Sequence, residues 1–226
     1  MFDALGTLVA LEPPGPLLRK GLRDRAGVEI SSAQADVALA AEITYYRAHL
    51  DEGRDRQSLA GLRRRCTEKL REALPADAQA IEAGALEAIL LGALRFSAFA
   101  DARNAIEAVR RLPARALVVS NWDVSLEDVL ANLELAPLLD GVVTSALAGA
   151  RKPSEAIFTR ALELAGVASE RAVHVGDSLE EDVAGARRAG IEPILLSRSG
   201  EAGPPEVTTI ASLSELARDL WPASSG

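Results

Sequence analysis

The chain has 226 residues, 48% of them hydrophobic and 26% charged, with a mean hydropathy of +0.09. At about 150 residues per domain, this length allows one or two domains with a buried core. The formal net charge of −8 and the pI near 5.0 argue against a protein that binds nucleic acid or acidic membranes. The single cysteine, Cys66, excludes an internal disulfide framework and a cysteine-rich zinc site.

The sequence shows no sign of membrane insertion or export. No apolar run approaches the roughly 20 residues that a membrane-spanning helix needs. The start, Met1-Phe2-Asp3, lacks the basic and apolar regions of a signal peptide. We therefore expect a soluble cytoplasmic protein, monomer or homodimer, that binds neither nucleic acid nor membrane.

The first part of the chain predicts one strand followed by helices. Residues 1–9 are expected to form a short apolar strand that runs into a turn at Gly6-Thr7. The prolines and glycine at 13–16 then break the chain and predict a linker. From about 17 to 95, the sequence is rich in Ala, Leu, Arg and Glu with helical spacing, which predicts three or four helices.

After residue 100, short continuous apolar strands alternate with amphipathic helices. This alternation predicts a doubly wound α/β fold, in which a parallel sheet is covered on both faces. A capping box, Ser212-x-x-Glu215, predicts the start of a last helix. Strands are predicted over 116–119, 142–143, 172–175, 194–196 and 207–210, and helices over 101–112, 125–134, 154–165 and 179–189.

The helical stretch therefore interrupts the α/β pattern after its first strand. We assign residues 1–13 and 98–226 to a Rossmann-like core domain and residues 14–97 to an inserted helical domain.

Polar residues gather where the predicted strands end. In an open parallel sheet, ligands bind at the carboxyl ends of the strands. Each such residue alone has an ordinary explanation as a cap, turn or surface residue, but their combination in this order predicts a single site. The segments are Asp3-Ala4-Leu5-Gly6-Thr7-Leu8, Ser120-Asn121, Lys152-Pro153 and Gly176-Asp177-Ser178, with Asp182 one turn into the following helix.

This ordered set of motifs resembles the haloacid dehalogenase superfamily of hydrolases, and the resemblance covers nearly the whole chain. Within the superfamily, the sequence is most similar to phosphatase-like members that carry a helical cap between the first and second motifs. The helical insert has that position here. The resemblance implies that Asp3 is a nucleophile that becomes an aspartyl-phosphate, with the phosphoryl group taken from a small phosphorylated metabolite.

The same resemblance implies a magnesium site. Its ligands would be the Asp3 carboxylate, the main-chain carbonyl of Leu5, and Asp177, with Asp182 binding directly or orienting another ligand. Oxygen donors of this kind suit Mg²⁺. Because a phosphate dianion would meet three carboxylates and one lysine, the cation is needed for binding.

The remaining motif residues would hold the substrate. By the resemblance, Ser120 and the backbone N–H of Asn121 bind the phosphoryl oxygens, and Lys152 pairs with Asp3 and the phosphate. Lysine and asparagine are both rare in this chain, so background composition explains neither Lys152 nor Asn121 well.

Leu5 departs from the pattern of the active phosphatases. These carry a second aspartate two residues after the nucleophile, which protonates the leaving group and activates water. Leucine cannot transfer a proton, and losing such a group costs about 10²–10⁴ in rate. The backbone carbonyl proposed for the metal is unaffected. We expect a site that forms the aspartyl-phosphate from good leaving groups and turns it over slowly.

Leu5 also keeps other functions open. Haloacid dehalogenases share the run D-A-x-G-T-L and lack that aspartate, but they are independent of metal and lack the pair found here as Gly176-Asp177. Phosphonate-cleaving members keep the metal and need a cap lysine for a Schiff base, for which Lys20 and Lys69 are the candidates. A third alternative is a binding or scaffold member with impaired catalysis.

Two further expectations concern the strands. Only two residues precede Asp3, whereas a central strand usually has about five, so we expect either a start upstream of Met1 or an unusually short strand. His174 lies inside a buried-looking strand, which favours a core or strand-end histidine over a catalytic one.

Overall fold

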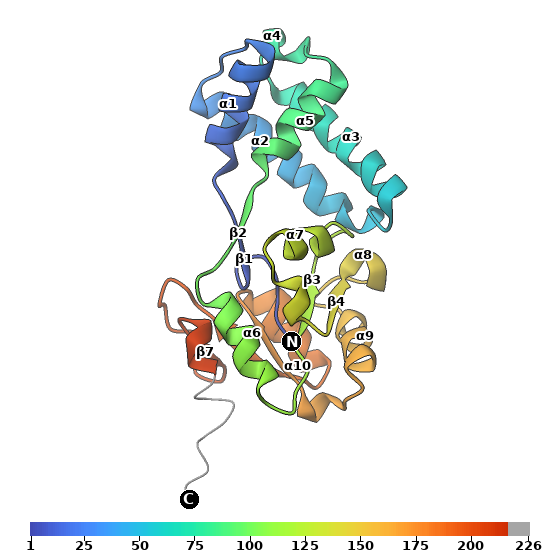
Figure 1. Cartoon of the computed structure of the whole chain (residues 1–226), viewed down its shortest axis with the longest axis vertical. Coiled ribbons are helices and arrows are strands. Elements are labelled where there is room, and N and C mark those ends of the chain that lie inside the picture. The colour runs from blue at the N-terminus through green and yellow to red at the C-terminus, as the bar shows by residue number, and fades with distance from the viewer. Residues whose placement is uncertain (217–226) are drawn as a thin grey trace, which may run out of the picture. The chain divides into compact units, whose positions relative to one another are not determined.

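A computed structural model describes residues 1–216 of the chain (Figure 1). The chain divides into two compact units, Met1–Ala10 with Ala98–Gly226, and Leu11–Ser97. The polypeptide leaves the first unit through β1 (Val9–Leu11) and returns through β2 (Phe96–Ala98), and these two strands pair side by side (Figure 1). The assignment of residues 14–97 to a cap domain stays a prediction.

The first unit is built on parallel strands, which confirms the predicted α/β fold. The strand β3 (Leu117–Ser120) pairs with β4 (Gly141–Thr144). In the second group, β5 (Val173–Gly176) pairs with β6 (Glu192–Leu196), which in turn pairs with β7 (Thr208–Ile210). All of these pairings are parallel, so the carboxyl ends of the strands lie at one edge.

The residues before Asp3 join the two groups of strands. On one side, the Phe2 N–H donates to the Leu117 carbonyl at 2.8 Å and the Phe2 carbonyl accepts from the Val119 N–H at 2.8 Å. On the other side, the Asp3 N–H donates to the Val175 carbonyl at 2.8 Å. Backbone hydrogen bonds on both sides therefore fix Asp3 at the carboxyl edge of the sheet.

Helices in the first unit connect these strands. The predicted helix over 179–189 differs from expectation, because it begins as a π-helical turn, Leu179–Ala184. The wide turn is closed by the Val183 N–H, which donates to the Ser178 carbonyl at 3.1 Å. The α-helices are α6 (Ala102–Arg110), α7 (Leu126–Asn132), α8 (Ser145–Ala148), α9 (Glu155–Ala165) and α10 (Gly185–Arg188).

The end of the described chain carries the predicted capping box. The Ser212 and Glu215 side chains cap each other's backbone N–H groups, and a short 3₁₀ turn, Leu213–Glu215, follows. The continuation of the predicted last helix lies outside the described residues.

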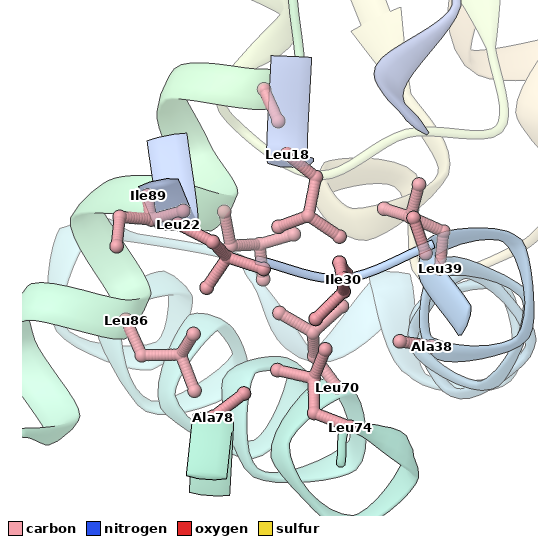
Figure 2. Close-up of a cluster of buried hydrophobic side chains, with 13 residues drawn as sticks. Leu18, Leu22, Ile30, Ala38, Leu39, Leu70, Leu74, Ala78, Leu86 and Ile89 are labelled. Carbon is pink, nitrogen blue, oxygen red and sulfur yellow. The ribbon is translucent and has the colours of Figure 1, made fainter. Parts of the chain in front are cut away.

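The second unit is helical, as predicted from its composition. Its helices are α1 (Pro14–Ala26), α2 (Ser32–His49), α3 (Arg56–Ala73), the one-turn α4 (Ala76–Gln79) and α5 (Ala83–Ala93). Figure 2 shows aliphatic side chains of these helices in one shared core, together with Ile30 from the loop between α1 and α2. The helical residues include Leu18, Leu22, Leu39, Leu70, Leu86 and Ile89. Within residues 1–216, no helix is long and apolar enough to cross a membrane.

The linker predicted at 13–16 is wrong, because α1 already begins at Pro14. The first N–H groups of a helix have no partner within it, and proline lacks this group and has a backbone φ suited to a helix. The helix α2 begins in the more usual way, with Ser31 and Gln34 bonding reciprocally to each other's backbone N–H groups.

Glu42 of α2 is a buried carboxyl that contacts α3. Its exposed fraction is 4%, and it forms a hydrogen bond with the thiol of the buried Cys66. Burial raises the pKa of Glu42 above its ordinary value of 4.5, although the bond from Cys66 opposes this shift. The folded protein therefore retains a proton at pH values where the unfolded chain has released it.

Because the pKa is raised on folding, the stability linked to Glu42 is fully present below about pH 4.5 and is lost as the pH rises through the raised pKa. We expect Glu42→Gln to unfold at a higher temperature than the wild type at about pH 8, since the glutamine carries no charge to bury. The difference should shrink as the pH is lowered towards about 4.5. A calorimetric difference that is the same at both pH values would contradict this interpretation.

Candidate active site

Four of the polar residues predicted to form the site meet at the carboxyl edge of the sheet. Asp3 follows Met1 and Phe2, which lie between β3 and β5 in the sheet. Ser120 ends β3, and Lys152 precedes α9. The Ser120 hydroxyl donates to Asp3 Oδ1 at 3.0 Å. The Lys152 ammonium donates to Asp3 Oδ1 and to Asp182 Oδ1, at 2.6 Å each. All four side chains are buried, so these charges interact with little screening by solvent.

The side chain of Asn121 holds Lys152 in place. Its amide donates to the Lys152 carbonyl at 3.0 Å, and its oxygen accepts from the Lys152 N–H at 2.7 Å. These two bonds connect the loop after β3 with the turn before α9. The sequence assigned a role to the backbone N–H of Asn121 and did not reveal this role of its side chain.

Asp182 is held by three donors. Lys152 and His174 Nε2 both reach Oδ1, the latter at 2.8 Å, and the Ser178 N–H donates to Oδ2 at 3.0 Å. The close approach of this side chain to β5 needs a glycine, because a Cβ at Gly176 would lie 2.1 Å from Asp182 Cγ. The π-helical turn therefore places Asp182 directly over the end of β5.

His174 is buried, as expected for a core or strand-end histidine, and it contacts the site through Asp182. Burial lowers its pKa to about 4, despite the neighbouring carboxylate. The ring is therefore neutral at physiological pH and donates from Nε2. Among residues 1–216, its Nδ1 has no hydrogen-bond partner. The spacing of eight residues between His174 and Asp182 was the available sequence signal, and it is weak by itself.

Asp177 completes an acidic cluster. One side-chain oxygen each from Asp3, Asp177 and Asp182 lie within 4.8 Å of one another. The turn after Asp3 packs tightly on this cluster, because a Cβ at Gly6 would lie 2.1 Å from Asp177 Oδ2. Gly6 also has a positive φ of 88°, a conformation that glycine adopts readily. A set of carboxylate oxygens at this spacing fits a divalent cation that prefers oxygen ligands, such as Mg²⁺.

The ionisation of the buried residues reflects one lysine shared by two carboxylates. Burial raises the pKa of Asp3 to about 7, although Lys152 opposes this shift. Burial also acts on Asp182, but Lys152 and His174 outweigh it and hold the pKa of Asp182 below its ordinary value. The pKa of Lys152 is raised, because the two carboxylates outweigh its burial. Lys152 is therefore protonated at physiological pH.

The other residues singled out in the sequence carry less chemistry. Leu5 is 39% exposed, and its side chain cannot exchange a proton. Lys20 and Lys69, the candidates for a Schiff base, are exposed and form ion pairs with Asp24 and Glu72. A Schiff-base lysine must lose its proton, whereas the bond to Glu72 raises the pKa of Lys69. These contacts weigh against a phosphonate-cleaving activity.

Comparison with known proteins supplies a family. A family model described as haloacid dehalogenase-like hydrolase matches residues 1–190. Haloacid dehalogenase-like hydrolase domain-containing protein 3 from Xenopus laevis is 41% identical over 95 residues, 42% of this chain and 39% of that protein. Ribulose-1,5-bisphosphate 5-phosphatase from Halopiger xanaduensis is 32% identical over 126 residues, 51% of this chain and 52% of that protein. The chain thus matches about two fifths to one half of the length of these curated relatives.

A solved structure shows the same fold. The 2-haloacid dehalogenase from Pseudomonas syringae pv. tomato DC3000 superposes with a TM-score of 0.68 over 97% of this chain and 96% of that one. The two sequences are 24% identical, so the likeness concerns the fold and not the substrate.

The shared lysine yields a prediction about stability. Lys152→Met leaves two buried carboxylates without their cation, and removing one partner of a buried ion pair costs about 3–5 kcal/mol. We expect a loss of this size in the free energy of unfolding, measured by urea denaturation in the presence of a chelator. Adding Asp182→Asn should restore part of it, because one of the two unpaired charges is removed.

The matched control is Arg160→Met, which breaks the exposed ion pair with Glu163. Exposed pairs of this kind contribute about 0–1 kcal/mol. If Lys152→Met were no less stable than Arg160→Met, the buried ion pairs would not be a main determinant of stability.

Proposed function

Because the chain belongs to the haloacid dehalogenase-like hydrolases, we propose that it is a magnesium-dependent phosphatase that acts on small phosphorylated metabolites through an aspartyl-phosphate on Asp3. The observation that carries this proposal is the placement of Asp3. Its carboxylate contacts both Ser120 and Lys152 and lies beside Asp177 and Asp182 at a spacing that suits a divalent cation. The name of the Halopiger relative, a sugar-phosphate phosphatase, supports this class of substrate.

Asp3 is the nucleophile in this proposal. The bonds from Ser120 and Lys152 both reach Oδ1, and we assign the attack on phosphorus to Oδ2. The P–O bond to the leaving group breaks as the bond from Asp3 to phosphorus forms. Water then attacks the phosphoryl group and releases inorganic phosphate, which restores the carboxylate.

Lys152 and the end of β3 hold the phosphoryl group. An ammonium has three N–H donors, of which two reach Asp3 and Asp182, and we assign the third to the phosphate. We assign the Asn121 N–H to another phosphoryl oxygen. The Ser120 hydroxyl has one proton, which reaches Asp3 Oδ1, and in this proposal it rotates from Asp3 to a phosphoryl oxygen when substrate binds. The bonds from the Asn121 side chain to Lys152 keep these groups at a fixed separation, which favours a preorganised site.

The residues that would hold Mg²⁺ are Asp3, the Leu5 carbonyl and Asp177. Asp182 already accepts bonds from Lys152, His174 and Ser178, so we assign it mainly to orienting Lys152 beside the metal. When bound, the cation supplies the positive charge that allows a phosphate dianion to approach these carboxylates.

Leu5 sets the expected limit on rate. Neither protonation of the leaving group nor activation of water can come from its side chain. Substrates with good leaving groups therefore form the aspartyl-phosphate readily, and its hydrolysis by unassisted water limits turnover.

Hydrolysis of an activated aryl phosphate, with Mg²⁺ or with chelator, tests this function. We expect magnesium-dependent turnover by the wild type and faster turnover by Leu5→Asp, by up to about 10²–10⁴-fold, since the new carboxyl supplies the missing base. Asp3→Asn is the control, and it should abolish turnover while its unfolding midpoint shows that the fold is intact.

The other outcomes are equally informative. Turnover that is unaffected by chelator would contradict the metal requirement, and an unchanged rate in Asp3→Asn would exclude the nucleophile. If neither the wild type nor Leu5→Asp shows turnover, the phosphatase proposal fails. A Mg²⁺ titration would then separate a metal-independent dehalogenase from a metal-binding protein without catalysis.

A further inference from the structure

Arg198, in the loop after β6, forms hydrogen bonds with the Gly6-Thr7 turn, which follows the proposed nucleophile Asp3. Its Nε donates to the Gly6 carbonyl at 3.1 Å, and its Nη2 donates to the Thr7 carbonyl at 2.6 Å. Its guanidinium carbon lies 3.6 Å from the centroid of the Phe99 ring, a cation–π contact. No sequence pattern distinguishes Arg198 from the many other arginines of the chain.

The same guanidinium is fixed from its other side by Asp101. Nη1 and Nη2 donate to the two oxygens of Asp101 at 3.2 and 3.1 Å. Asp101 also accepts from the Ser212 hydroxyl at 2.7 Å and from the Leu213 N–H at 2.9 Å. Among the described residues, Oδ1 accepts from Arg198 alone, whereas Oδ2 accepts from Arg198, Ser212 and Leu213, so Asp101 is itself fixed and holds the guanidinium in one orientation.

These contacts join the two crossing points of the chain. Gly6 and Thr7 precede β1, where the chain leaves the first unit, and Phe99 and Asp101 follow β2, where it returns. Arg198 binds both segments and so fixes each of them to the carboxyl edge of the sheet.

The Gly6-Thr7 turn also packs against the acidic cluster of Asp3, Asp177 and Asp182. Gly6 lies so close to Asp177 that a Cβ would come within 2.1 Å of its carboxylate. Gly6, Phe99, Asp177 and Arg198 all line one pocket of about 510 Å³. A shift of the turn would therefore move Leu5 and Gly6 relative to Asp177.

We propose that Arg198 is a positioning residue that fixes the Gly6-Thr7 turn and thereby sets the distance between the Leu5 carbonyl and Asp177, and with it the affinity of the site for a divalent cation. This inference rests on the proposed function in its assignment of the metal ligands. Arginine suits the task because its planar fork serves two carbonyls and a carboxylate at once, whereas lysine has a single nitrogen.

The test compares Arg198→Met with Arg115→Met. Arg115 is exposed and also donates to a backbone carbonyl, that of Leu164. It precedes β3 and therefore lies at the end of that strand away from the site. Both substitutions are Arg→Met, so they remove the same charge and cause the same change in side-chain size. Calorimetric titration with Mg²⁺ measures the affinity of each folded variant. Loss of a group that orients metal ligands typically weakens binding about 10–100-fold, and we expect this loss in Arg198→Met but not in Arg115→Met.

Two further readouts separate positioning from a general loss of stability. At saturating Mg²⁺, the kcat of Arg198→Met should approach the wild-type value, and Arg198→Lys should have an intermediate affinity. In the metal-free protein, amide hydrogens of residues 4–9 should exchange faster in Arg198→Met than in Arg115→Met, because the anchor of their turn is gone.

Equal Mg²⁺ affinity in Arg198→Met and Arg115→Met would overturn the proposal. If the wild type binds no Mg²⁺, the proposed function fails by itself, and amide exchange then decides about the turn. Unchanged exchange over residues 4–9 would overturn the role of Arg198. If Arg198→Met does not fold, Arg198→Lys replaces it in each comparison.

Discussion

The ammonium of Lys152 is the interaction on which the first unit depends. It is one cation between two buried carboxylates, Asp3 and Asp182, which lie far apart in the sequence. A buried charge without a partner is very costly, so all three residues must arrive together. The fold meets this requirement by ending strands and beginning helices at one edge. The residues that form the candidate site, Asp3, Lys152 and Asp182, therefore also contribute to the stability of the sheet edge.

Close approach is the second constraint. Gly6 and Gly176 each face a carboxylate at a distance that no other residue allows, one against Asp177 and the other against Asp182. The π-helical turn over Leu179–Ala184 adds the sideways shift that brings Asp182 over the strand. Local irregularities thus lie where the acidic groups converge, while the strands behind them stay regular. Functional residues commonly lie on loops in this way, while a rigid sheet holds the loops in place.

The fold was predictable from the sequence because apolar strands and amphipathic helices alternate after residue 100. The strand ends also located Asp3 and Ser120, since parallel strands bring their carboxyl ends to one edge. Lys152 was located by its place just before the predicted helix 154–165. Three features were not predictable: the π-helical turn, the Asn121 side-chain bonds, and the hydrogen bonds of Arg198 to Gly6, Thr7 and Asp101. Each depends on a specific side-chain orientation or on one shifted backbone bond, and neither leaves a periodic signal. The prolines at 13–16 misled because proline both breaks helices and begins them.

The two bonds between Asn121 and the backbone of Lys152 have a consequence for how this sequence can change. The Asn121 Nδ2 donates to the Lys152 carbonyl at 3.0 Å, and its Oδ1 accepts from the Lys152 N–H at 2.7 Å. Aspartate would set a second acceptor against the Lys152 carbonyl, leucine would offer neither group, and glutamine is one methylene too long. Position 121 therefore tolerates few alternatives, even though its side chain is not assigned to the substrate. A substitution at position 121 would first displace Lys152, which lies thirty-one residues further along the chain.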